Sequence, residues 1–177
     1  MYRIDKLLKQ DQKLFHTGDL ALLWGINNKN TLYTAIKRYV QKGILISIHK
    51  GFYSTIPLDQ LVPIRLALGF LHRFAYVSCE TILINKGIIF QKENYYSLVS
   101  DISTNFTIVD KHFKVRKMKD KYLFNDQGII KKDGIAFAGV ERAVIDILYF
   151  NPTFNFDNRA GVNWQKVKKM QKEMRSI

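Results

Sequence analysis

The segment that most constrains the fold runs from residue 19 to residue 53, DLALLWGINNKNTLYTAIKRYVQKGILISIHKGFY. It contains two helical patterns separated by a tight turn at Gly25, and a hairpin pattern follows them. We place the first helix over residues 17–24 and the second over residues 31–42, with Asn30 as N-cap and Gly43 as the C-terminal stop. An earlier helix is expected over residues 3–14. This order of elements predicts a winged helix-turn-helix.

The helix predicted over residues 31–42 has two chemically distinct sides when its residues are spaced at about 100°. One side is apolar and consists of Leu32, Ala35, Ile36, Tyr39 and Val40. The opposite side holds hydrogen-bond donors and cations, namely Thr34, Lys37, Arg38 and Gln41. Such a face suits base edges and phosphates in a major groove. An amphipathic helix with a solvated polar face is the alternative, and the flanking turn and hairpin favour DNA binding.

The hairpin is expected over residues 44–55, and Gly51 can take the positive φ that its turn requires. His49 and Lys50 lie at its tip, where a wing contacts phosphate or the minor groove. The candidate DNA-binding residues of this N-terminal part are therefore Lys29, Asn30, Thr31, Thr34, Lys37, Arg38, Gln41, Lys42, His49 and Lys50.

The charge of the 177-residue chain is +13, and it is unevenly spread. Residues 1–56 hold 9 basic and 3 acidic side chains, residues 57–153 hold 13 and 10, and residues 154–177 hold 6 and 2. A basic surface is expected of a protein that binds a phosphate backbone, although a high isoelectric point is also common in small cytosolic proteins. We divide the chain into a winged helix (1–56), an α+β domain (57–153) and a C-terminal tail (154–177).

The middle region combines helical and strand patterns, so the predicted fold class is α+β. We expect helices over residues 63–73, 78–86 and 140–150, with Pro63 in the first turn of one and Ser78 as the cap of another. Short strands are expected between residues 88 and 138, at the segments IIF, YYSLV, FTIV, FKVRKM, KYLF, GII and IAFA.

No catalytic pattern is found in this region. A metal-dependent nuclease would need an acidic residue and then an acidic residue two positions before a lysine. Glu80, Glu93 and Glu141 are instead followed at that spacing by isoleucine, tyrosine and alanine. We therefore expect no enzymatic activity.

The single cysteine, Cys79, is also not interpreted as a catalytic residue. Its position at a helix N-terminus could lower the pKa of the thiol, with His72 or His112 as a partner, but we favour a buried and inert side chain. The four histidines show no metal-ligand spacing, so no metal and no cofactor are expected. The absence of an internal disulfide, of a signal peptide and of a long apolar run leads us to expect a cytoplasmic protein without membrane association.

Two further groups of charged residues require interpretation. The segment KHFKVRKMKDK, residues 111–121, predicts an accessory basic surface or a solvated strand face, with Lys114, Arg116, Lys117 and Lys119 as candidates. Arg142 and Asp146 lie four residues apart on a predicted helix. We interpret them as an ion pair that contributes roughly a few tenths of a kcal/mol.

The tail predicts a last helix over residues 164–175, capped by Asn163. Its apolar stripe, Trp164, Val167, Met170 and Met174, indicates a helix that docks on the rest of the protein. Its remaining surface is basic, and we expect that surface to be accessory.

The order of these segments resembles the AbiEi family. The N-terminal pattern DLA-LWGI-N-NTLYTAIKRYVQKGIL–KGFY is followed by YVSCETILINKGII and GVERAVIDILYF, and the chain closes with FNFDNRAGVNWQKVKKMQ. Members of that family are antitoxins and transcriptional regulators of type IV toxin–antitoxin and abortive-infection systems. The likeness covers most of the chain. One departure is Val140, because the family usually has proline before the Glu-Arg-Ala that follows it.

The resemblance implies a winged helix that binds double-stranded DNA upstream of its own operon and represses it. It also implies a C-terminal domain that counters a nucleotidyltransferase-type toxin encoded alongside, without a stable complex. The residues that carry over are those of the recognition helix and wing tip, Thr31, Thr34, Lys37, Arg38, Gln41, His49 and Lys50.

Two other classes of function stay open at this point. The first is a nucleic-acid-processing enzyme that depends on an acidic residue such as Glu80 or Asp101. The second is a solitary winged-helix regulator or protein-interaction module without a toxin.

Overall fold

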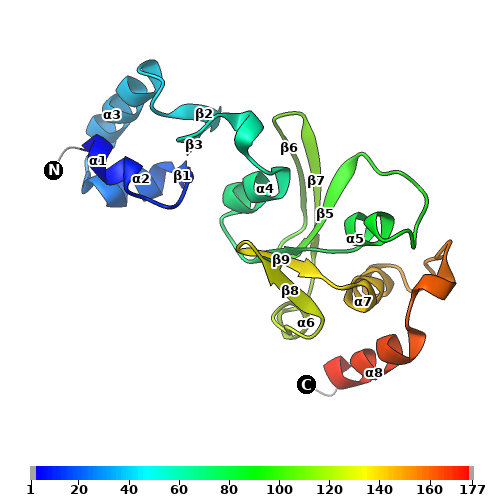
Figure 1. The fold of residues 1–177 in the computed structure, drawn as a ribbon. Coiled ribbons are helices and arrows are strands. Elements are labelled where there is room, and N and C mark those ends of the chain that lie inside the picture. The colour runs from blue at the N-terminus through cyan, green and yellow to red at the C-terminus, as the bar shows by residue number, and fades with distance from the viewer. Residues whose placement is uncertain (1–2, 176–177) are drawn as a thin grey trace. The chain divides into compact units, whose positions relative to one another are not determined.

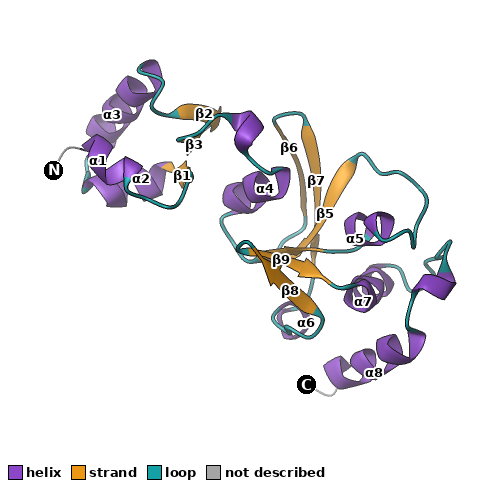
Figure 2. Cartoon of the chain, viewed as in Figure 1, coloured by secondary structure: helices purple, strands orange, loops and turns teal. Residues whose placement is uncertain are grey.

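The structure is a computed structural model that describes residues 3–175, and the chain forms two compact units (Figure 1). The first unit extends to His72, and the second begins at Arg73. Both helices and strands occur in each unit, as Figure 2 shows, so the α+β class expected from the sequence is confirmed.

The first unit combines three helices, a three-stranded antiparallel sheet and a fourth helix. Its core is one apolar cluster that includes Leu7, Phe15, Leu20, Trp24 and Leu45. The sheet has the order β1-β3-β2. The elements are α1 Arg3–Leu8, β1 Leu14–His16, α2 Thr17–Trp24, α3 Lys29–Gln41, β2 Ile46–His49, β3 Phe52–Ser54, the 3-10 turn Leu58–Gln60 and α4 Pro63–Leu71.

Two details of this unit differ from our expectations. The helix expected over residues 3–14 ends at Leu8, and Leu14 lies instead in strand β1, where it pairs with Ser54. The N-cap of α3 is Asn28 rather than Asn30, since the Asn28 side chain accepts a hydrogen bond from the Thr31 amide at 3.0 Å. Asn30 consequently lies in the first turn of the helix.

Helix α4 belongs to the first unit, whereas our division of the sequence ended the N-terminal part at residue 56. The reason is its contact with the small sheet. The His16 ring is 2.8 Å from the carbonyl oxygen of Gly69, and the Phe70 ring lies edge-on to Phe52 at 5.9 Å between centroids. A Cβ atom at position 69 would lie 2.8 Å from the Leu14 Cδ1 atom, so a larger residue there would require the Leu14 side chain to shift.

The second unit is built on a six-stranded mixed sheet with the order β6-β7-β5-β4-β9-β8. Strands β5 and β7 are parallel, as are β4 and β9, and the other neighbours are antiparallel. The elements are β4 Ala75–Val77, α5 Glu80–Asn85, β5 Tyr95–Ser100, β6 Thr104–Ile108, β7 Lys111–Lys117, α6 Asp120–Leu123, β8 Ile129–Lys132, β9 Ile135–Ala138, α7 Val140–Phe150, the 3-10 turn Arg159–Gly161 and α8 Trp164–Arg175.

In this unit, the structure differs from our sequence-based expectations in short segments. The KYLF segment expected as a strand is the single helical turn α6, and the IIF segment is a loop whose two isoleucines are buried. Strand β4 has no counterpart among our expectations, because three buried residues are too few to show an alternating pattern. Cys79 rather than Ser78 precedes α5, and the Ser78 hydroxyl points instead to Asp146.

Besides the single turn α6, three helices complete the second unit. Helices α5 and α7 pack on the sheet, and α8 packs on α7, as the ribbon of Figure 1 shows. The expected docking of α8 by its apolar stripe is confirmed, since Val167, Met170 and Met174 are buried. Asn163 caps this helix as predicted by accepting a hydrogen bond from the Lys166 amide at 3.0 Å.

Among residues 3–175, no helix combines the length and the apolar character that would let it cross a membrane.

Candidate nucleic-acid interface

Helix α3 separates an apolar face from a polar one, as predicted. Leu32, Ala35 and Ile36 are buried in the core of the first unit, and Tyr39 stacks on Trp24 with 5.1 Å between ring centroids. Because the apolar face is fully engaged, the orientation of the helix is fixed and its opposite face is turned to solvent.

The ten residues that the sequence proposes as DNA contacts are all exposed. The hydroxyl of Thr34 donates to the Asn30 carbonyl oxygen at 2.8 Å, and the hydroxyl of Thr31 donates to the Asn28 side chain at 3.3 Å. These two hydroxyls therefore have partners inside the helix. Within residues 3–175, no hydrogen bond or ion pair engages the side chains of Lys37, Arg38 and Gln41.

The stretch of sequence that contains this face carries charge of one sign. Residues 20–58 contain no aspartate or glutamate, and they contain the five cations Lys29, Lys37, Arg38, Lys42 and Lys50. Such a stretch produces a positive potential that attracts a polyanion, and no acidic side chain within it offsets that potential.

The turn before α3 is set by local backbone chemistry. Gly25 ends α2 with φ +64°, a left-handed conformation that favours glycine, and the Ile26 amide then donates to the Ala21 carbonyl oxygen at 3.0 Å. Ile26 is buried, so the chain is anchored between the two helices.

The hairpin β2–β3 is anchored at its tip. The Thr17 amide donates to the Gly51 carbonyl oxygen at 2.9 Å, which attaches the tip to the start of α2. The His49 ring lies edge-on to Phe70 at 5.3 Å between centroids. Of the two tip residues, Lys50 is therefore the one whose side chain extends freely into solvent.

One exposed residue of α3 is absent from our sequence-based set. Tyr33 is 55% exposed and lies beside the polar face, one turn from Lys37. An aromatic residue in an amphipathic helix is usually assigned to the core, and for that reason the pattern alone did not identify it. At about 100° per residue Tyr33 falls at the edge of the apolar face, between Val40 and Lys37, and this position is the signal that could have done so.

The accessory surface expected on β7 is only partly formed. Phe113 and Val115 are buried as expected. However, Arg116 does not extend into solvent, because its guanidinium donates two hydrogen bonds to the Glu80 carboxylate, one of them at 2.6 Å. Lys114 lies over the Tyr95 ring at 5.0 Å, and the remaining candidates, Lys117 and Lys119, are exposed.

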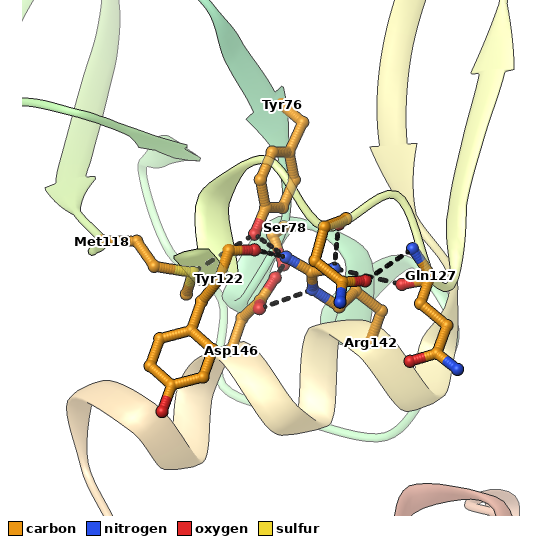
Figure 3. A network of polar contacts seen from close by, with 8 residues as sticks. Tyr76, Ser78, Met118, Tyr122, Gln127, Arg142 and Asp146 are labelled. Carbon is orange, nitrogen blue, oxygen red and sulfur yellow. Dashed lines mark hydrogen bonds and ion pairs between the residues drawn. The ribbon is translucent and has the colours of Figure 1, made fainter. Parts of the chain in front are cut away.

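The Arg142–Asp146 ion pair is present as expected, but it is buried rather than a simple pair within one helix that contributes roughly a few tenths of a kcal/mol. Both side chains are fully buried, and the Arg142 Nε donates to Asp146 at 2.8 Å. The other guanidinium N–H groups donate to the Tyr76 hydroxyl and to backbone carbonyl oxygens of Tyr122, Asn125 and Gln127, at 2.7 to 3.0 Å (Figure 3). All five donors of the arginine are therefore satisfied.

This network joins segments that are distant in sequence. Ser78 completes it by donating to Asp146 at 2.6 Å, so β4, α6 and the loop before β8 are all attached to α7. Burial lowers the pKa of Arg142, but Asp146 and Tyr76 outweigh that effect and raise it, so the guanidinium stays charged. Because no atom of the pair is exposed, we assign the network a structural role.

The acidic residues that a catalytic interpretation would use are held in ion pairs. Burial raises the pKa of Glu80, but hydrogen bonds from Arg116 and Ser97 outweigh burial and lower it to about 2. A hydrogen bond from Arg73 lowers the pKa of Asp101. Burial raises the pKa of the Cys79 thiol, which is inaccessible as expected. Among residues 3–175, no group of three or more potential metal ligands is found.

Comparisons with known proteins give a likeness of fold. No family model matches the chain, and no curated protein matches it. The crystal structure of the RV2827C protein from Mycobacterium tuberculosis is similar, with a TM-score of 0.51 and 12% sequence identity. The match covers 86% of this chain and 60% of that one. The TM-score supports a shared fold.

Proposed function

We propose that the chain is a sequence-specific DNA-binding repressor whose first unit acts as a winged helix and whose biological role is that of a type IV antitoxin. In this proposal α3 is the recognition helix and the β2–β3 hairpin is the wing. Arg38, Lys37 and Gln41 contact base edges, while Lys29, Lys42 and Lys50 hold phosphates.

The observation that carries the proposal is the exposed polar face of α3, set beside an anchored basic hairpin in a stretch without acidic residues. A helix of 13 residues is about 20 Å long, and the major groove of B-DNA, about 12 Å wide, admits such a helix. Arg38 and Gln41 can form paired hydrogen bonds with guanine and adenine, respectively, because these side chains have matching donors and acceptors.

The antitoxin role is supported by the resemblance of segment order to the AbiEi family. It assigns the second unit to counteracting a nucleotidyltransferase-type toxin. Co-expression with the gene encoded alongside tests it: growth should be restored by the intact chain. An Arg38→Ala variant should still restore growth, because that substitution lies in the DNA-binding unit. Loss of rescue in this folded variant would mean that repression, rather than the second unit, provides the protection.

The DNA-binding role is tested by a gel-shift titration with the DNA immediately upstream of the chain's own gene, beside a scrambled fragment of equal length. At physiological salt we expect the native fragment to bind at least about a hundredfold more tightly. Equal, salt-sensitive binding to both fragments would leave a basic protein without sequence preference. That result would favour a protein-interaction module with an acidic partner.

A further inference from the structure

Tyr33 is a large aromatic side chain that α3 presents to solvent, with 55% of its surface exposed. Within residues 3–175, no hydrogen bond or ring contact holds it in place. Lys29 lies one helical turn before it and Lys37 one turn after it, and both lysines are exposed. We call these three residues the Lys29–Tyr33–Lys37 ridge.

A single exposed aromatic residue needs no explanation by itself, but the position of this one is informative. Tyr33 is the fifth residue of α3 and lies one helical turn before Lys37, which the proposed function places on a base edge. The neighbouring polar side chains suit guanine and adenine, whereas thymine is distinguished in the major groove by its 5-methyl group. Among the exposed side chains of α3, the Tyr33 ring offers the largest apolar surface for such a methyl group.

We propose that Tyr33 is a specificity-determining residue whose ring packs on the 5-methyl group of a thymine, with Lys29 on the flanking phosphate. This inference rests on the proposed DNA-binding function and extends it from hydrogen bonding to apolar readout. The rigid ring contributes contact area with few rotatable bonds, so little conformational entropy is lost on binding.

The test combines a protein substitution with the removal of a single methyl group from the DNA. Each thymine in the protected part of the upstream fragment is replaced in turn by deoxyuridine, and the full-length chain is titrated against every fragment. We expect wild-type affinity to fall about fourfold at one position, the effect of one buried methyl-sized group. Tyr33→Ala should bind the unmodified fragment at least as weakly as the wild type binds the fragment with deoxyuridine at that position. The variant should not distinguish thymine from deoxyuridine there.

Two control variants separate the ring from other effects. Tyr33→Phe keeps the ring and should keep the response to deoxyuridine. Leu22→Ala removes another exposed apolar side chain of the same unit, 84% exposed on α2, and should respond as the wild type does.

If Tyr33→Ala responds to every deoxyuridine as the wild type does, or if the wild type responds to none, the role of Tyr33 is overturned while specific binding stands. If the wild type binds native and scrambled DNA equally, the proposed function fails first, and the assignment of Tyr33 fails with it.

Discussion

Glu80 carries its negative charge in the interior of the second unit, where only 8% of the residue is exposed. Its pKa falls from the ordinary 4.5 to about 2, because hydrogen bonds from Arg116 and Ser97 outweigh burial. A carboxyl with a lowered pKa stabilises the folded state above its ordinary pKa. That contribution is lost as the pH falls from about 4.5 toward about 2.

We therefore predict that Glu80→Gln lowers the free energy of unfolding at neutral pH by on the order of 2 to 3 kcal/mol. The difference from the wild type should shrink as the pH falls through this window, because the protonated wild type resembles the amide. Urea denaturation followed by circular dichroism at several pH values measures it. Asp126→Asn changes an exposed acid of the same unit and should have little effect at neutral pH. A Glu80→Gln deficit that is constant with pH would contradict this account.

Arg142 shows how a buried charge depends on its partners. We predict that Arg142→Met destabilises the second unit by roughly 3 to 5 kcal/mol, because it leaves Asp146 buried without a counter-charge. Lys166→Met is the matched control, since it breaks the exposed ion pair with Glu141 at the start of the same helix and should cost no more than about 1 kcal/mol. Equal midpoints for the two variants in chemical denaturation would show that the network is not needed for stability.

The same residue marks the limit of prediction from the sequence. The spacing of Arg142 and Asp146 predicts a pair on one helix, and the structure contains that pair. Its burial could not be predicted, because the partners that satisfy the guanidinium lie 15 to 66 residues away along the chain. Arg116 was misjudged for a similar reason: alternation along β7 places it opposite Phe113 and Val115, but only the fold brings Glu80 to it.

At the scale of elements, periodicity predicts the long segments and fails for the short ones. The helices Thr17–Trp24, Val140–Phe150 and Trp164–Arg175 have the bounds expected from their apolar spacing. Helix α6 has a single turn, in which aromatic and lysine residues resemble a strand, and α1 ends at Leu8 whereas Leu14 pairs in strand β1. The polar face of α3 could be predicted because its thirteen residues sample every direction around the helix axis.

The proposed roles of α3, which contacts base edges, and of the hairpin, which holds phosphates, lead to a prediction about DNA affinity. Arg38→Ala should weaken binding to the upstream fragment by roughly 1 to 3 kcal/mol and relax the preference at one base pair, because an arginine on base edges reads sequence. Lys50→Ala should instead weaken native and scrambled DNA alike. It should also reduce the slope of log affinity against log salt by about 0.9. Salt-dependent titrations of both variants measure the two effects, and an identical response of the two would remove the distinction between helix and wing.

At the scale of the whole molecule, the positive charge is carried by both units. In the second unit, strand β7 ends at Lys117 and Lys119 lies two residues after it, and both side chains are exposed. Two other cations of this unit are held in ion pairs: Arg116 binds Glu80, and Arg73 binds Asp101. Unpaired exposed lysines are the ones that can release counterions from DNA when they neutralise phosphates.

If the accessory surface contacts the same DNA, the full-length chain must show it in its salt dependence. We predict that the double substitution Lys117→Gln/Lys119→Gln reduces the salt slope by about 2, while the ratio of native to scrambled affinity stays unchanged. The double variant Lys131→Gln/Lys132→Gln removes two exposed lysines from β8 and should leave the slope as it is. A slope that is the same in all three proteins would confine the phosphate contacts to the first unit, and Lys117 and Lys119 would then be a solvated strand end. A fall in both double variants would indicate general charge attraction rather than a defined surface, because removing any two lysines would have the same effect.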